Sequence, residues 1–167
     1  MALTVPFPSG VLAALVLIAP TTATALPDRQ TGPAIAEASA PLEAVSVVDA
    51  FHGALASGDT AQAAKLVSDA VLVFEAGGAE RSRAEYASSH LAADASFAQA
   101  VPAELTRRTG GASADIAWVA SEGRTRGRFR DRDVDRVTTE TAILQKLDGV
   151  WRIVHVHWSS RAPAAAH

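Results

Sequence analysis

Five side chains that could exchange protons or form strong hydrogen bonds lie on segments that we expect to surround a cavity: Glu75, Tyr86, His90, Asp94 and Glu140. Tyr86, His90 and Asp94 recur every four residues, so on one helix they would form a polar stripe along one face. A carboxylate or imidazole whose pKa is shifted by burial can act as a general base. Glu75 and His90 are therefore our candidate catalytic residues. The alternative is that the stripe faces solvent.

Two histidines, His155 and His157, lie two residues apart in a segment with the character of a strand, so they should share one face of a sheet. With His90 or Glu140 nearby, two imidazoles could bind zinc or copper. The alternative is that one histidine forms a hydrogen bond in a pocket wall while the other packs. No second ligand spacing supports a metal, so we predict neither a metal ion nor another cofactor.

Trp118 and Trp158 could form an aromatic wall suited to an apolar ligand, although packing in a core or a dimer interface would also explain them. We predict that the ligand pocket is lined by aromatic, acidic and imidazole side chains, namely Phe51, Tyr86, Trp118, Glu140, His155 and His157.

The segments that would position these residues are helices first and strands later. An apolar stripe predicts a helix that starts near Leu42 and ends at Gly58, and Asp59 or Thr60 can cap a second, short helix. Ser82 and Glu85 fit a capping box that opens a third helix, to about Phe97. Strands are expected at 71–74, 103–109, 115–129, 134–146 and 151–159, with turns at Gly110-Gly111, Arg130–Asp133 and Asp148-Gly149. This order predicts an α+β fold with a curved antiparallel meander.

The last predicted strand is apolar on both faces. Simple alternation sends Trp151, Ile153, His155 and His157 to one face and Val154, Val156 and Trp158 to the other. Helices can cover one face of the sheet, and the second face then needs another cover. We therefore predict a homodimer formed by sheet packing.

The chain ends predict processing rather than fold. Residues 1–25 carry no charged side chain and include a nine-residue apolar run followed by a small-residue cleavage pattern, which indicates a signal peptide cleaved after Ala25. Residues 26–41 read as a flexible linker, 42–161 as the domain and 162–167 as a disordered tail. We expect a periplasmic or secreted protein with no membrane contact after cleavage.

Composition narrows the function classes. The net charge is −3, which does not favour nucleic-acid binding because phosphate contacts need a basic surface. The chain has no cysteine, so disulfides, thiolate zinc sites and cysteine nucleophiles are excluded together.

Two motifs resemble a known superfamily. The segment FHGALASGD (51–59) is similar to the helix end that opens NTF2-like domains, and TET (139–141) followed by DGVWRIVHVHWS (148–159) is similar to their closing strands. SnoaL-like, DUF4440-type and ketosteroid-isomerase-like proteins share this pattern, as does the association domain of calmodulin-dependent kinase II. The resemblance implies a cone in which three N-terminal helices pack on a curved antiparallel sheet.

The resemblance also implies differences at the site. Ketosteroid isomerases carry a hydrogen-bonding tyrosine where this chain has Phe51, and their proton-shuttling carboxylate falls near Glu75. The kinase association domain carries pocket arginines where this chain has Ala120 and Ala142. We therefore expect an exported protein that binds a small molecule. The alternatives are an isomerase or lyase with Glu75 or His90 as base, and a structural dimerisation module without an active pocket.

Overall fold

The computed structural model describes residues 40–164, so the predicted signal peptide, nearly all of the predicted linker and the last three residues of the predicted tail lie outside it. Four helices and six strands follow one another in the order α1 (Leu42–Ser57), α2 (Thr60–Leu66), β1 (Val67–Glu75), β2 (Gly78–Glu80), α3 (Arg83–Ser89), α4 (Leu91–Ala100), β3 (Ala103–Ser113), β4 (Ile116–Phe129), β5 (Arg132–Leu147) and β6 (Val150–Arg161). In this part of the chain no helix is long and apolar enough to cross a membrane.

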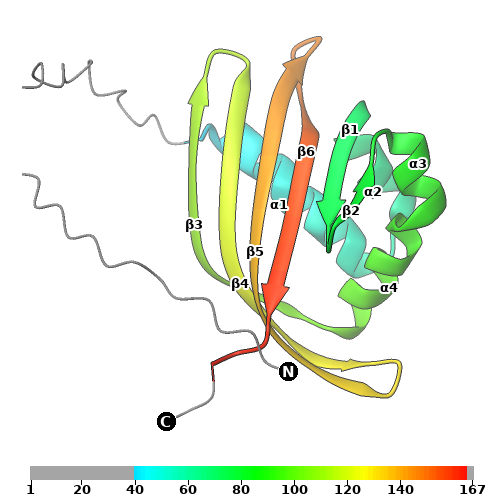
Figure 1. Cartoon of the computed structure of the whole chain (residues 1–167). Coiled ribbons are helices and arrows are strands. Elements are labelled where there is room, and N and C mark those ends of the chain that lie inside the picture. Colours follow the sequence, from blue (N-terminus) through cyan, green and yellow to red (C-terminus); the bar gives the residue numbers. More distant parts are fainter. Residues whose placement is uncertain (1–39, 165–167) are drawn as a thin grey trace, which may run out of the picture. The chain divides into compact units, whose positions relative to one another are not determined.

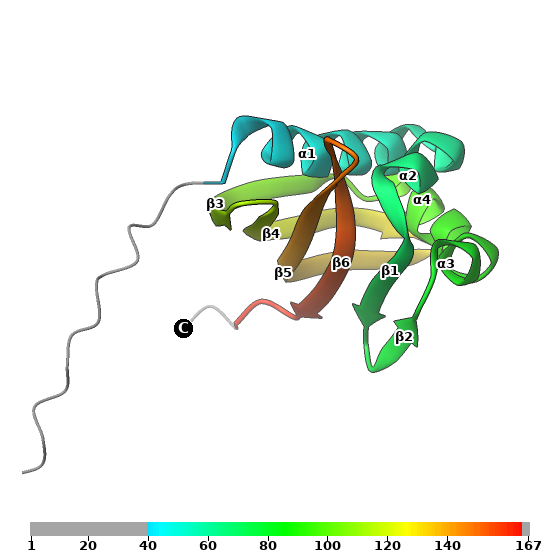
Figure 2. The same ribbon diagram turned by 90° about the horizontal axis from the view of Figure 1, so that it is seen from above.

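The predicted α+β class is confirmed, with two changes in detail. The strands form one sheet in the order β2-β1-β6-β5-β4-β3, and β1 runs parallel to β6, so the sheet is mixed rather than wholly antiparallel. Helix α1 crosses one face of the sheet, and the opposite face carries no helix of the described residues (Figures 1 and 2). The sheet therefore has an inner face under the helices and an outer face that is open.

The predicted third helix is two helices, and this brings the number of helices to four. It breaks at His90, between α3 and α4. The Ser88 and Ser89 hydroxyls both donate to the Glu85 carbonyl, at 3.0 and 2.8 Å, and so compete with the backbone bonds that would continue the helix. The break lets the Tyr86 side chain reach Asp94, which a straight helix would place two turns away.

Local signals set most other boundaries as predicted. Asp59 caps α2 by accepting from the backbone of Gln62 at 2.9 Å, and Ser82 caps α3 by accepting from Glu85 at 3.1 Å. Asp148 and Gly149 have φ of 50° and 80° and connect β5 to β6, as the hairpin signal indicated. The predicted turn at Gly110-Gly111 is wrong, because both glycines lie within β3 and the turn follows Ser113.

A β-bulge in β6 changes which side chains share a face. Ile143 pairs with His155, while the next residue, Leu144, pairs with Ile153, so Val154 is an extra residue on its strand. Ile153 and Val156 are therefore both buried on the inner face. The predicted grouping of Trp151 and Ile153 with the two histidines is wrong for this reason, since simple alternation does not survive a bulge.

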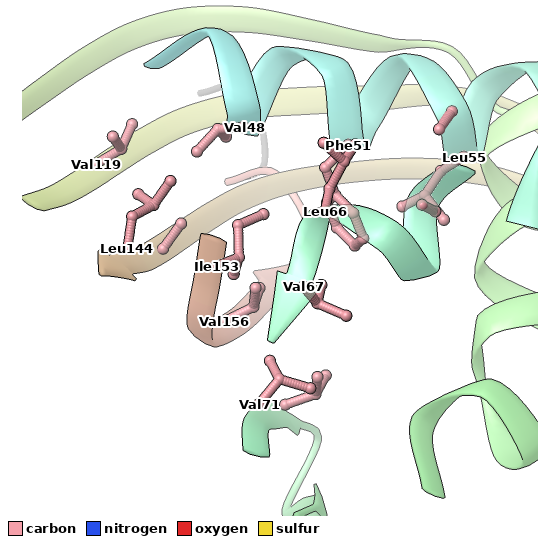
Figure 3. Packing of buried hydrophobic residues seen from close by; sticks show 14 of the residues in the cluster. Val48, Phe51, Leu55, Leu66, Val67, Val71, Val119, Leu144, Ile153 and Val156 are labelled. Carbon is pink, nitrogen blue, oxygen red and sulfur yellow. The ribbon is translucent and has the colours of Figure 1, made fainter. Parts of the chain in front are cut away.

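The core lies between α1 and the inner face of the sheet. Val48 and Phe51 of α1 lie over Leu144, Ile153 and Val156 of the sheet, and all five are at most 1% exposed (Figure 3). This packing fixes the angle at which α1 crosses the strands. The C-terminal half of α1 and the neighbouring helix α4 lie over another part of the inner face, where a cavity remains between the helices and the sheet.

Candidate functional site

A cavity of about 410 Å³ lies where α1 and α4 face the inner surface of β3, β4, β5 and β6. Its apolar wall combines side chains from both helices, from the connection that follows α4 and from strands β3 and β6, namely Leu55, Phe97, Ala98, Val101, Leu105 and Trp158. Its polar wall comes mainly from the strands and contains hydroxyl, carboxylate and guanidinium groups. A mostly apolar cavity with a few convergent polar groups is the usual form of a small-molecule site.

Glu140 of β5 is the most buried acid of this cavity. It is 8% exposed, and one of its oxygens, Oε2, is 2.7 Å from Nε2 of His52 and accepts a hydrogen bond from Nε1 of Trp158 at 2.6 Å. Burial alone would raise the pKa of the Glu140 carboxyl, but the hydrogen bond and charge of His52 and the bond from Trp158 outweigh it, so the pKa lies below its usual range. Glu140 is therefore ionised at neutral pH.

The other oxygen of Glu140, Oε1, is buried and has no hydrogen-bond partner among the described residues. Buried carboxylate oxygens almost always have a partner, because an unpartnered one loses its hydration without replacement. Glu140 therefore places an ionised carboxylate in the wall of the cavity, with one oxygen held by His52 and Trp158 and the other buried without a partner.

Arg108 of β3 forms the neighbouring part of the wall. Its Nη1 donates to Asp49 of α1 at 2.7 Å and its Nε donates to Ser121 of β4 at 3.2 Å. The guanidinium is thereby held between helix and sheet, and its charge is paired with a carboxylate. Arg136 lies at the rim, where its guanidinium is within 3.4 Å of Ser160.

A second hollow of about 110 Å³ adjoins the first, and Glu75, Asp94 and Trp158 line both. Tyr86 is fully buried, and its hydroxyl donates to Oδ2 of Asp94 at 2.8 Å. Burial raises the pKa of Asp94 although the Tyr86 bond opposes it, and burial followed by the charge of Asp94 raises the pKa of Glu75. The two carboxyls therefore hold a proton to higher pH than isolated carboxyls would.

His90 lines the smaller hollow but points its ring at Glu80. Its Nδ1 contacts Oε1 of Glu80, which is 6% exposed, while the histidine side chain itself is 61% exposed. The hydrogen bond to Glu80 and the charge of that carboxylate raise the pKa of His90. His90 is thus an imidazole in contact with solvent, next to the carboxyl pair.

The sequence model of the SnoaL-like domain matches residues 45–164, which is most of the chain. The chain belongs to the SnoaL-like family. The resemblance inferred from the two sequence motifs is confirmed.

Solved structures agree with this NTF2-like assignment. A Shewanella frigidimarina protein, provisionally named a ketosteroid isomerase, is 35% identical with a TM-score of 0.68, covering 70% of this chain and 94% of that one. An NTF2-like protein from Streptomyces avermitilis, provisionally named a dehydratase, is 18% identical with a TM-score of 0.61, covering 74% and 95%. The C. elegans CaMKII association domain is 21% identical with a TM-score of 0.55, covering 69% and 91%. The last two share the fold alone. No curated protein matches the sequence.

Some of the predicted site residues of this SnoaL-like domain come together and others do not. Glu75 and Glu140 line the larger cavity, and His90 lines only the smaller hollow. Tyr86 and Phe51 lie behind the cavity wall: Tyr86 bonds to Asp94, and Phe51 stacks on Trp158 with ring centroids 6.3 Å apart.

The other three predicted pocket residues lie on the outer face. His157 pairs with Thr141 and alternates with Trp158, which faces the cavity, and His155 pairs across to Ile143 beside Trp118. Phe74 lies between the two histidines, with ring centroids 5.0 Å from His155 and 6.4 Å from His157. The prediction that Trp118, His155 and His157 line the pocket is wrong, and for the histidines the cause is the bulge at Val154.

Sequence reasoning missed His52, Asp49, Arg108 and Ser121, which reach Glu140 and its surroundings only through tertiary folding. This chain has Ala120 and Ala142 where the association domain carries its pocket arginines. Its cavity nevertheless contains two arginines from other positions, Arg108 and Arg136. Within residues 40–164, no group of three or more histidine or acidic side chains is arranged to hold a metal ion.

Proposed function

We propose that this SnoaL-like protein binds a small, partly apolar organic molecule in the 410 Å³ cavity. The observation that carries the proposal is a mostly apolar cavity wall that also contains a few hydroxyl groups and the ionised carboxylate of Glu140. The hydroxyls of Ser121, Thr138 and Ser160 offer hydrogen bonds to a ligand. Such a wall would bury the body of a ligand while the hydroxyls orient its polar end.

Native mass spectrometry of the mature chain from Leu26, purified without a metal-affinity tag, tests this proposal. We expect extra mass on the protein or, if the ligand is lost, quenching of Trp158 fluorescence by small aromatic compounds in a chain where Trp118 and Trp151 are replaced by Phe. Ala98→Phe should abolish binding because Ala98 lines the cavity, and Ala92→Phe, exposed on the same helix, should not. Equal binding by both variants would contradict the proposal.

A second candidate, catalysis of an isomerase or lyase type, is supported by the Glu75 and Asp94 pair. Two interacting carboxyls with raised pKa values favour a state in which one is ionised and the other protonated. Ionised Glu75 would remove a proton next to a carbonyl, and protonated Asp94, backed by Tyr86, would donate to the carbonyl oxygen. This donor would take the place of the tyrosine that Phe51 replaces.

Turnover of a β,γ-unsaturated ketosteroid, followed through the absorbance of its conjugated isomer, tests the catalytic candidate. The choice rests on the Shewanella frigidimarina relative. Glu75→Gln should reduce kcat by about a hundredfold or more, the usual size of a general-base contribution. His90→Gln should have a small effect, because the exposed His90 is paired with Glu80. Unchanged turnover in Glu75→Gln would exclude Glu75 as the base, and the reverse pattern would make His90 the base.

The third candidate, a structural module without an active pocket, has less support. A cavity filled by Trp118 and leucine side chains would have favoured this candidate, but Trp118 lies on the outer face of the sheet. The exposed apolar side chains of the outer face also support a homodimer.

Export to the periplasm or medium remains part of the proposal on sequence grounds alone. Residues 1–25 have the composition of a cleavable signal peptide. Intact mass of the protein recovered from the periplasm of an exporting host should correspond to a chain beginning at Leu26. Retention of Met1 in a cytoplasmic product would contradict it.

A further inference from the structure

His52 of α1 and Glu140 of β5 form a pair in the wall of the larger cavity. Nε2 of His52 lies 2.7 Å from Oε2 of Glu140, and both residues line the cavity. The carboxylate is buried, whereas the side chain of His52 is 43% exposed. Glu140 is therefore the inner member of the pair, and the imidazole is the member that a ligand can reach.

The charge of Glu140 decides which nitrogen of His52 carries the hydrogen. Although burial would raise the pKa of Glu140, the hydrogen bonds from His52 and Trp158 hold it below its usual range. An ionised carboxylate only accepts hydrogen bonds, so the nitrogen that contacts it, Nε2, carries the hydrogen. In a neutral imidazole the other nitrogen, Nδ1, then has a free lone pair and can accept a proton.

Nδ1 of His52 is not used elsewhere in the described part of the chain. It forms no hydrogen bond within residues 40–164, and the only buried polar side-chain atom there without a partner is Oε1 of Glu140. Nδ1 is therefore an accessible acceptor rather than a buried one.

The core holds the pair in one orientation. Nε1 of Trp158 donates to the same Oε2 at 2.6 Å, and the Trp158 ring stacks on Phe51 with centroids 6.3 Å apart. Phe51 is 1% exposed, and its ring also makes an edge contact with His52 at 5.7 Å. A base held by a buried carboxylate, which is itself held by a third group, is the arrangement that general-base catalysis requires.

We infer that His52 is a general base of the cavity, positioned by Glu140, and that it removes a proton from a compact organic ligand with an acidic C–H bond. Nδ1 takes the proton, and the electron pair of the C–H bond passes to a carbonyl or a leaving group of the ligand. The imidazolium keeps its contact with Glu140, whose negative charge stabilises it, and later returns the proton to water. This inference rests on the proposed binding function and adds a reaction class and its base.

The probe 5-nitrobenzisoxazole tests the inference, because it is a compact aromatic molecule with one acidic C–H bond, at C3. Removal of this proton breaks the N–O bond of the ring, forms a nitrile and releases a coloured cyanophenolate. Absorbance at pH 7 gives kcat and KM for the mature chain, and we expect saturable turnover. The 3-methyl analogue lacks the reactive proton, so calorimetry with it measures binding without reaction.

His52→Ala should reduce kcat by about a hundredfold or more, the usual contribution of a general base. Affinity for the 3-methyl analogue should stay within about twofold, because the apolar wall is intact. Added imidazole should restore part of the rate, beyond what imidazole alone gives in solution, since it can take the place of the missing ring. His157→Ala is the matched control: this histidine lies exposed on the outer face, and its loss should change neither quantity.

Glu140→Gln tests the positioning role, because it keeps the shape of the side chain and removes its charge. It should lower kcat by about tenfold or more while the affinity for the 3-methyl analogue stays within about twofold. Circular dichroism confirms folding of each variant. Nitrogen-15 NMR of the wild-type protein needs no variant, and in neutral His52 it should place the hydrogen on Nε2.

The outcomes separate this inference from the binding function. Binding of the 3-methyl analogue without turnover of the probe, turnover that survives His52→Ala, or a His52 hydrogen on Nδ1 overturns the inference while the binding function stands. Absence of binding by the probe and its analogue, together with a mature chain that carries no extra mass, overturns both.

Discussion

Tyr86 shows how one side chain can connect the core to the site. Its ring is fully buried, and its hydroxyl donates to Oδ2 of Asp94 at 2.8 Å across the break between α3 and α4. Burial, followed by the charge of Asp94, raises the pKa of Tyr86 far above its ordinary value, so the hydroxyl keeps its proton at all physiological pH values. The bond therefore supports Asp94 whatever the protonation state of Glu75.

Tyr86→Phe should reduce the free energy of unfolding by about 1–3 kcal/mol, the usual cost of leaving a buried hydrogen-bonding group without its partner. Chemical denaturation at pH 7 measures this loss. A double-mutant cycle with Asp94→Ala, which removes the acceptor, isolates the pair, and the effects of the two substitutions should be far from additive. Additive effects would mean that the hydroxyl and the carboxyl do not interact.

Asp94 should make stability depend on pH in a direction opposite to that of a salt-bridged acid. Its pKa is raised in the folded state, so the folded protein binds this proton more tightly than the unfolded chain does. Stability from this group is complete below the ordinary carboxyl pKa of about 3.9 and is lost as pH rises through the folded-state value. Glu75, whose pKa is also raised, contributes with the same sign.

Asp94→Asn removes this dependence while its amide oxygen can still accept from Tyr86. The variant should melt at a higher temperature than wild type at pH 7, and the difference should vanish at about pH 3, where the wild-type carboxyl is protonated. Thermal melts across this pH range test it. A variant that is equally destabilised at both pH values would contradict the raised pKa.

Among individual residues, the sequence predicted some of those that line the cavity and missed others for a physical reason. Glu75 and Glu140 carry recognisable chemistry and lie where strands of an NTF2-like fold face the cavity. His52 and Trp158 contact Glu140, and the charge of Arg108 acts on it, only after distant segments of the chain pack together, and no local spacing encodes that. The pKa of Glu140 depends on its own burial and on the charges and hydrogen bonds of its neighbours, and these arise only in the folded chain.

At the scale of elements, a single extra residue decides which side chains reach the cavity. Without the bulge at Val154, strand alternation would send His155 and His157 inward with Ile153 and would send Trp158 outward. With it, Trp158 reaches Glu140. The Asp148-Gly149 hairpin turn, the caps at Asp59 and Ser82 and the end of α1 at Gly58 were predicted because they depend on a few adjacent residues. The bulge and the parallel pairing of β1 with β6 depend on tertiary contacts.

Two glycines of α1 and its cap allow a test in which the same substitution, glycine to alanine, should change the free energy of unfolding in opposite directions. Gly58 closes α1 with φ of 77°, whereas Gly53 lies inside the helix with nothing within 4 Å of the place of a β-carbon. Gly58→Ala should lower the free energy of unfolding by about 1–2 kcal/mol because an L-residue is strained there. Gly53→Ala should raise it by about 0.5–1 kcal/mol.

Urea denaturation of the two alanine variants measures both effects on the same helix. A β-carbon at residue 58 would also meet the Gln99 side chain at 2.5 Å, but that flexible end can move, so the backbone strain is the larger cost. A Gly58→Ala variant as stable as wild type would show that α1 does not end in the left-handed conformation.

At the scale of the whole molecule, the four helices of residues 40–164 lie on one face of the sheet, and none of them covers the other (Figure 2). Five large apolar side chains on that outer face are each 37–48% exposed, namely Leu72, Ile116, Trp118, Leu147 and Val150. Strand pairing aligns them with Ile143, Phe74 and the histidine pair. An exposed apolar surface that spans β1, β4, β5 and β6 is characteristic of an interface.

We therefore expect a homodimer in solution in which two outer faces pack together, which would also bury His155 and His157 without any metal. Sedimentation velocity on the mature chain should give a dimer, and Trp118→Glu should give a monomer, because it places a charge in the middle of the apolar face. Leu42→Glu is the control: Leu42 is 83% exposed at the start of α1, away from this face, and its change should leave the dimer intact. A monomeric wild type would contradict the homodimer, and a dimer that survives Trp118→Glu and dissociates in Leu42→Glu would move the interface away from the sheet. Because the cavity lies on the inner face and Trp118 does not line it, Trp118→Glu should also leave any co-purified ligand mass per protomer unchanged in native mass spectrometry.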